Sequence, residues 1–123
     1  MRVLLLAGAV VLAGCERDSD SPTGVNCPDV AIPAISVATL NLFTGQPITG
    51  IAEVVVRDGA YADTAHGIGS PPRYAAAYNR AGTYTISVQA PGYRAWEYTG
   101  AVVRPGICNV TTLPLAAWML PSL

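Results

Sequence analysis

The sequence predicts an all-β protein, a seven-stranded antiparallel β-sandwich, and three observations lead to this prediction. First, Tyr84, Ile86 and Val88 alternate with polar residues between Gly82 and Tyr93, which is the period of a strand with one buried face. Second, other short stretches of similar character recur along the chain between turn residues. Third, twelve glycines and ten prolines are spread along the 123 residues, which suits turns better than helices. A half-buried strand needs a second layer, so we expect two sheets to pack together.

The first candidate strand is Ala34–Phe43, in which the apolar residues change parity. Ile35 and Val37 share one parity, whereas the leucines at 40 and 42 share the other. This change of phase predicts a β-bulge or a change of buried face near Thr39.

A turn-bearing connection, Thr44–Gly50, separates this strand from the next one, Ile51–Asp58. Ala52, Val54 and Val56 alternate there and should share the buried face. The following stretch, 59–72, lacks periodicity and contains two adjacent prolines. We expect it to be the longest loop of the domain.

The second half of the chain is again divided by turn residues. Further strands are expected at Arg73–Arg80, from Gly82 up to the turn at Pro91-Gly92, and at Tyr93–Tyr98, 101–103 and 107–113, with another turn at 104–106. The apolar stretch Leu115–Leu120 should end the sheet.

The N-terminus has the pattern of an export signal. Met1-Arg2 is followed by an apolar run of the length found in signal-peptide cores, too short to span a bilayer. The run ends in Leu12-Ala13-Gly14-Cys15, which resembles the lipobox of bacterial lipoproteins. The resemblance implies that residues 1–14 are removed and that Cys15 carries acyl chains such as palmitate, which anchor the protein to a membrane. An ordinary secretory signal is the alternative. Polar residues 16–26 then form a flexible tether.

Two cysteines remain beyond Cys15, namely Cys27 and Cys108. An even pair in an exported chain predicts a disulfide, which would tie the start of the domain, residues 27–123, to one of its last strands. A redox pair and a metal site are the alternatives, although zinc requires more cysteine and histidine ligands than this chain supplies.

Two stretches carry a family resemblance. Thr44-Gly45-Gln46-Pro47-Ile48 with the strand after it, and the alternating segment from Gly82 to Tyr93, resemble the carboxypeptidase regulatory-like domain. That domain is a transthyretin-like (prealbumin-like) sandwich of seven strands, found in bacterial exported and lipid-anchored proteins. The resemblance covers about residues 35–115 and implies an accessory or interaction module without a peptidase active site.

Composition and motifs disfavour several classes of function. The chain has no lysine and its arginines are scattered, so it lacks the basic stripe of a nucleic-acid-binding protein. His66 is the only histidine, and with Asp63 it makes a weak acid/base or metal motif. We therefore predict no catalytic residue, no metal and no cofactor.

The candidate ligand-binding residues are Arg94, Trp96 and Tyr98. On a strand these three side chains would project on one face, and exposed aromatic rings beside an arginine suit a flat sugar or peptide. Alternatively, Trp96 belongs to the core and Tyr98 lies at its rim.

The sequence thus predicts a non-catalytic, lipid-anchored protein of the bacterial cell envelope, whose sandwich is a structural or interaction module. The expected place of the anchor is the outer membrane, with the domain on its periplasmic or surface side, and the inner membrane is the alternative. A glycan- or peptide-binding lipoprotein is the second hypothesis. The expected partners are the membrane and an envelope protein or glycan. The oligomeric state does not follow from the sequence.

Overall fold

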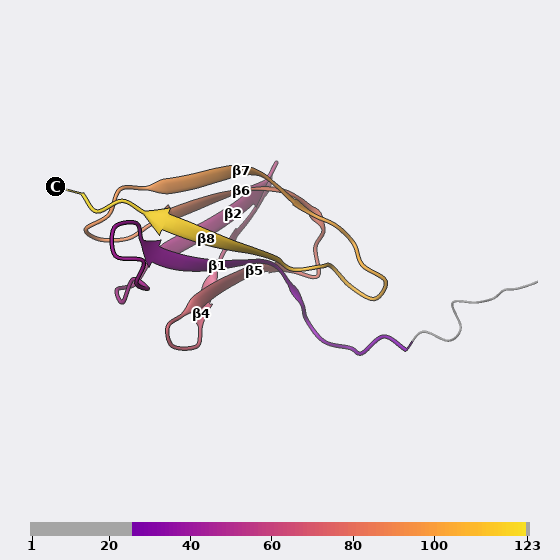
Figure 1. The fold of residues 1–123 in the computed structure, drawn as a ribbon. Helices are drawn as coiled ribbons and strands as arrows, with labels where there is room; N and C mark the ends of the chain where they lie inside the picture. Colours follow the sequence, from indigo (N-terminus) through magenta and orange to yellow (C-terminus); the bar gives the residue numbers. More distant parts are fainter. Residues whose placement is uncertain (1–25, 123) are drawn as a thin grey trace, which may run out of the picture.

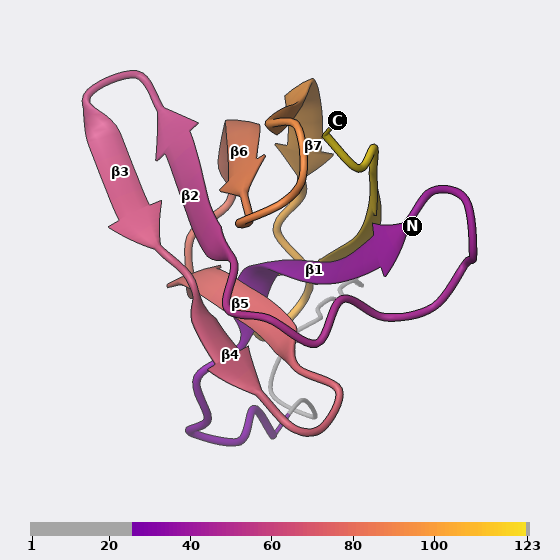
Figure 2. The same cartoon turned by 90° about the vertical axis from the view of Figure 1, so that its left-hand side faces the viewer.

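The computed structural model describes residues 26–122, and within them the fold consists of strands and connecting loops. Eight strands form two packed sheets of four, seen from two sides in Figures 1 and 2. Sheet A has the order β4-β5-β1-β8, and sheet B the order β3-β2-β6-β7. The strands are β1 (Pro33–Asn41), β2 (Glu53–Asp58), β3 (Tyr61–Thr64), β4 (His66–Ile68), β5 (Arg73–Tyr78), β6 (Gly82–Gln89), β7 (Trp96–Val103) and β8 (Leu113–Met119).

The all-β sandwich is confirmed, but its strands differ from the prediction in number and direction. The described residues hold eight strands instead of seven, and β1 pairs with β8 in parallel. The other pairings are antiparallel. Parallel pairing demands a long crossover, here the whole of sheet B together with β4 and β5, which separate β1 from β8 along the chain.

The core lies between the sheets and is built from the alternating residues of the central strands. On β6, Tyr84, Ile86 and Val88 are completely buried, as the alternation predicts. Val88 and Ile86 lie opposite Val54 and Val56 of β2, which are also completely buried. Burial of each such aliphatic side chain stabilises the fold by about 1.5–3 kcal/mol.

The loop predicted at 59–72 is wrong, because this stretch contains β3 and β4. Gly59, with φ +60°, and Ala60 form a two-residue turn that pairs Asp58 with Tyr61. The chain then crosses from sheet B to sheet A at the buried Ala65, whose N–H donates to the carbonyl of Val54. Strands of four and three residues are too short to produce a visible period.

The bulge predicted near Thr39 is also wrong. The register between β1 and β8 runs without interruption from Ile35 to Asn41. Thr39 occupies the next core position after Val37 and is only 3% exposed, while the leucines that changed the parity turn away from the core. The irregularity lies instead between β6 and β7, where the register shifts beside Gly100 at φ +76°.

Strand β5 is confirmed. It contains a backbone irregularity that the sequence does not indicate. Ala77, fully buried, has φ +58°. The Oδ2 atom of Asp63, on β3 of the other sheet, accepts a hydrogen bond of 2.9 Å from the Ala77 N–H. This contact joins sheet B to sheet A.

The ends of the last two strands differ from expectation. Strand β7 begins at Trp96, whereas Tyr93 forms an isolated bridge with Pro121. The stretch expected as a strand at 107–113 is largely a loop that carries Cys108, and β8 begins at Leu113. Residues 115–119 do belong to the sheet, as predicted.

Candidate functional site

The predicted aromatic site lies on β7, at the edge of sheet B. Trp96 and Tyr98 pair with Val88 and Ile86 of β6. Because paired residues share a face and both β6 residues are buried, the two aromatic residues lie on the inner face of the sheet. Their rings stack with centroids 6.1 Å apart and planes inclined by 10°.

This pair is shared between the core and the surface. Trp96 is half-buried and packs against the core, which is the position that the core alternative describes. Tyr98 remains 44% exposed. The pair therefore presents the exposed Tyr98 ring at the edge of the sandwich, and the packing of Trp96 against the core holds the stack in place.

Arg94 does not belong to the strand that carries the aromatic pair. It precedes β7 and is exposed, and its N–H donates a 2.8 Å hydrogen bond to the carbonyl of Leu120. The two cation–π contacts within residues 26–122 involve Arg80 instead.

A shallow hollow adjoins this edge of the sandwich. It measures about 500 Å³ and its lining includes Glu53, Pro91 and Tyr93. The Tyr93 hydroxyl accepts a hydrogen bond of 3.2 Å from the Asn41 amide, which fixes one wall. Trp96 and Tyr98 do not line it, so the stacked pair and the hollow are neighbouring features and do not form one enclosed site.

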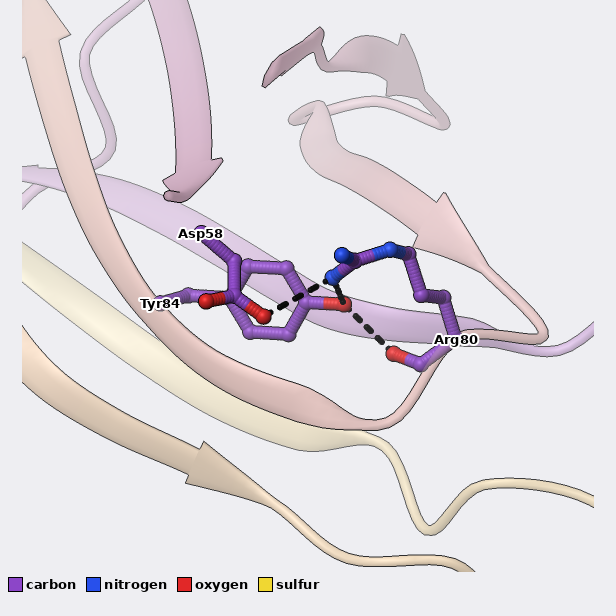
Figure 3. Close-up of polar contacts among 3 residues, drawn as sticks. All are labelled: Asp58, Arg80 and Tyr84. Carbon is purple, nitrogen blue, oxygen red and sulfur yellow. Dashed lines mark hydrogen bonds and ion pairs between the residues drawn. The ribbon is translucent and has the colours of Figure 1, made fainter. Parts of the chain in front are cut away.

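The most connected polar cluster of the described chain surrounds Arg80, a residue that sequence analysis missed (Figure 3). Its Nη1 atom lies 3.0 Å from Oδ2 of Asp58 and 3.1 Å from the hydroxyl of Tyr84. The Tyr84 hydroxyl in turn donates to the backbone carbonyl of Arg80. The guanidinium also lies over the ring of Tyr61, 3.9 Å from its centroid.

One sequence feature allows this arrangement. A Cβ atom on Gly82 would lie 2.5 Å from Oδ2 of Asp58, so a larger residue there would displace the carboxylate. Gly82, the first residue of β6, is therefore the feature of the sequence that could have indicated this cluster. Within the cluster Arg80 and Asp58 bind each other, although their side chains remain 35% and 33% exposed.

The cluster alters the proton affinity of its members. The hydrogen bonds of Arg80 to Tyr84 and then to Asp58 raise the pKa of the guanidinium, which keeps it charged. Burial, followed by the negative charge of Asp63, raises the pKa of Tyr61. The charge of Arg80 opposes this second shift, because a nearby cation lowers the pKa of a tyrosine hydroxyl.

The structure places Asp63 and His66 in different roles. Asp63 accepts the hydrogen bond from Ala77, whereas His66 lies exposed on β4. Within residues 26–122, no group of three or more histidine, cysteine or acidic side chains is arranged to hold a metal ion.

The predicted disulfide between Cys27 and Cys108 is present, with Cα atoms 5.2 Å apart. It connects the segment before β1 to the loop before β8, instead of to a strand. Asn109 strengthens the same junction, because its amide donates to the carbonyl of Val30 and to the side chain of Asn79.

The predicted signal peptide, 1–14, and the lipidation site Cys15 lie outside the described residues, as does the tether apart from Asn26. In the part of the chain that the structure describes, no helix is long and apolar enough to cross a membrane. No family model matches this chain, and no curated protein matches it.

Proposed function

We propose that this protein is a non-catalytic bacterial lipoprotein whose β-sandwich serves as a structural or interaction module at the cell envelope. The observation that carries the proposal is Leu12-Ala13-Gly14-Cys15 at the end of an apolar run. Two or three acyl chains on Cys15 would hold the domain firmly, because each buried methylene contributes about 0.8 kcal/mol.

The disulfide supports an exported location. Disulfides persist in oxidising compartments such as the periplasm, and this one closes most of the domain into a covalent loop. The proposed location is therefore an oxidising one, with the domain on the periplasmic or outer surface of a membrane, for which we propose the outer membrane.

The use of the ionisable side chains supports a non-catalytic module. Asp58 and Arg80 bind each other, Asp63 holds the backbone of β5, and Arg73 donates to Ser36. These groups perform structural work, whereas a catalytic site needs groups directed at a substrate.

We propose further that the domain is of the carboxypeptidase regulatory-like, transthyretin-like type. Two packed sheets of four strands support this proposal, as does the strand Gly82–Gln89 within the segment from Gly82 to Tyr93 that carries part of the resemblance. A fold of this kind specifies architecture rather than partner.

Mass spectrometry of the protein from membranes of an expressing bacterium tests the anchor. We expect the chain to begin at an acylated Cys15, and we expect Cys15→Ser to be released from the membrane fraction. An unacylated native chain that begins elsewhere would refute the proposal.

The stacked pair on β7 favours a second candidate, a lipoprotein that binds a glycan or peptide. Exposed aromatic rings at a strand edge suit such ligands. Trp96 fluorescence, recorded in a Trp118→Phe background, should shift on titration with peptidoglycan fragments if this candidate is correct. The shift should disappear in Tyr98→Ala, and an unchanged spectrum would refute this candidate.

A further inference from the structure

The outer face of sheet A is apolar, which is unusual for a sheet whose other face already forms the core. Ile35, Val37, Ala117 and Met119 point inward and are completely buried, so the residues between them project outward. Strand pairing places the outward residues together: His66 and Ile68 of β4, Arg73 and Ala75 of β5, Ser36, Ala38 and Leu40 of β1, and Pro114, Ala116 and Trp118 of β8. We call this set the A face.

The A face exposes large hydrophobic side chains at both of its edges. Trp118, paired with Leu40, is 47% exposed, and Ile68 at the opposite edge is 57% exposed. A shallow hollow of about 290 Å³ lies between them, and its lining includes Leu40, Arg73 and Pro114. The hollow therefore joins the outward residues of β5, β1 and β8.

The outer face of sheet B has the opposite character. Register with the buried residues of β2 and β6 places mainly polar side chains outward: Glu53, Val55 and Arg57 of β2, Ala62 and Thr64 of β3, Thr83, Thr85, Ser87 and Gln89 of β6, and Glu97 and Val102 of β7. This face, the B face, suits water. The sandwich is thus amphipathic as a whole, which a protein surrounded only by water does not need.

The charge on the A face is of one sign. No outward residue of the set is acidic, and Arg73 is its arginine. Its Nε atom donates to the Ser36 hydroxyl at 3.0 Å and its Nη2 atom to the Ser36 carbonyl at 3.2 Å, so the guanidinium is held across β1. A guanidinium has five N–H donors, and those not used by Ser36 remain available for an anionic oxygen.

The chain enters the domain on the same side as the A face. In Figures 1 and 2 the indigo segment that leads into β1 runs on the sheet A side of the sandwich, away from sheet B. Cys15 precedes Cys27 by about a dozen residues, which reach at most about 40 Å. An acyl anchor on Cys15 therefore keeps the domain close to the lipid surface and attaches it from this side.

From these observations we infer that the A face lies on the lipid bilayer, with Trp118, Leu40 and Ile68 in the headgroup region and Arg73 at the lipid phosphates. The inference rests on the proposed lipid anchor. Tryptophan suits the boundary between water and hydrocarbon, and an anionic surface attracts a face that has a cation and no carboxylate. The B face then faces away from the membrane, toward any envelope partner.

The two tryptophans provide a direct test, because Trp118 lies on the A face and Trp96 on the inner edge of sheet B. The acylated full chain is reconstituted into vesicles of phosphatidylethanolamine and phosphatidylglycerol that include phosphatidylcholine brominated in its acyl chains. Trp96→Phe reports Trp118 alone, and Trp118→Phe reports Trp96 alone. We expect brominated lipid to reduce Trp118 emission at least twofold and to leave Trp96 emission within about 10%.

A matched pair of substitutions tests the face itself in the Trp96→Phe background. Ala116→Glu places a carboxylate on the A face and should abolish the quenching of Trp118. Thr83→Glu places one on the exposed B face and should leave the quenching intact. Circular dichroism confirms that each variant is folded.

Each outcome has one meaning, because acylation and vesicle flotation are measured on the same samples. A chain that is not acylated and does not float refutes the anchor. An acylated, floating chain with Trp118 unquenched, or with both tryptophans quenched equally, refutes the orientation but keeps the anchor. Sedimentation as a dimer, with Trp118 protected from aqueous quencher in the absence of lipid, would assign the A face to a second copy and also refute the inference.

Discussion

The carboxylate of Asp63 and the backbone N–H of Ala77 form a hydrogen bond between the two sheets at 2.9 Å. Ala77 at this position has φ +58°, in the left-handed region that alanine rarely adopts. An acidic side chain on one sheet thus holds an unfavourable backbone conformation on the other.

Ala77→Gly should therefore be nearly neutral. Glycine relieves about 1–2 kcal/mol of left-handed strain, and this gain offsets the lost methyl burial and the greater entropy of the unfolded glycine. Ala76 is equally buried but does not have a positive φ, so Ala76→Gly should lower the free energy of unfolding by about 1–2 kcal/mol. Urea denaturation measures both, and equal losses would contradict the strain at Ala77.

Asp63→Ala should destabilise the fold by about 1–3 kcal/mol, because it leaves the Ala77 N–H without its acceptor in the interior. Asp63→Asn retains an oxygen that can accept this hydrogen bond and should lose less. The comparison is made by chemical denaturation of the two variants, and it fails if asparagine is as harmful as alanine.

Tyr84→Phe should cost about 1–2 kcal/mol. The substitution keeps the buried ring but removes the hydroxyl that donates to the Arg80 carbonyl and accepts from its guanidinium. Tyr61→Phe is the matched control, because the Tyr61 ring contacts Arg80 while its hydroxyl makes no hydrogen bond to another described residue. A larger loss from Tyr61→Phe in thermal or urea unfolding would contradict this assignment.

The stability of the protein should decrease above about pH 10. Burial and the charge of Asp63 raise the pKa of Tyr61 in the folded state, so the folded protein holds this proton more tightly than the unfolded chain does. The resulting stabilisation is complete below the unfolded pKa and is lost as the pH rises through the folded pKa. Urea midpoints between pH 8 and 11 should fall less steeply in Tyr61→Phe than in the wild type.

Reduction of the Cys27–Cys108 disulfide should lower the free energy of unfolding by about 4–5 kcal/mol, as the chain-entropy model gives for a sequence separation of 81. Denaturation with and without dithiothreitol measures this loss. The double variant Cys27→Ala/Cys108→Ala should match the reduced protein and should not respond to the reductant. A stability unaffected by reduction would contradict the prediction.

The central strands were predictable from sequence because they obey the simple alternation of a half-buried strand. The strand expected to begin at Gly82 and to stop before Pro91-Gly92 is found at Gly82–Gln89, and Val54 and Val56 face the core as expected. The disulfide was predictable because only two cysteines follow the anchor position. These features depend on local pattern or on counting.

The features that sequence analysis missed depend on contacts between distant segments. Strands β3 and β4 are short and are defined by their neighbours, β2 and β5. The parity change at Leu40 does not indicate a bulge, because the outer face of β1 is apolar too and both faces of the strand carry hydrophobic residues. Arg80 lies between β5 and β6, and its partners Asp58 and Tyr84 lie on β2 and β6. No spacing pattern in the sequence indicates that these three residues meet.

The candidate site was predictable only in part. The adjacency of Trp96 and Tyr98 follows from strand alternation, and their rings do stack. Which face they occupy depends on the pairing of β7 with β6, and the bulge beside Gly100 changes the relation between residue parity and face along β7. Arg94 lies before the strand begins, so alternation does not apply to it.

The position of the disulfide has a mechanical consequence. When the two chain ends are pulled apart, tension entering at Cys27 passes through the sulfur atoms to Cys108, so residues 28–107 lie in a closed loop that bears no load along its backbone. Extension is confined to the N-terminal stretch and to the residues after Cys108, where β8 must separate from β1 before the chain can lengthen. A domain held by one end at a moving surface is thereby protected against unravelling from its first strand.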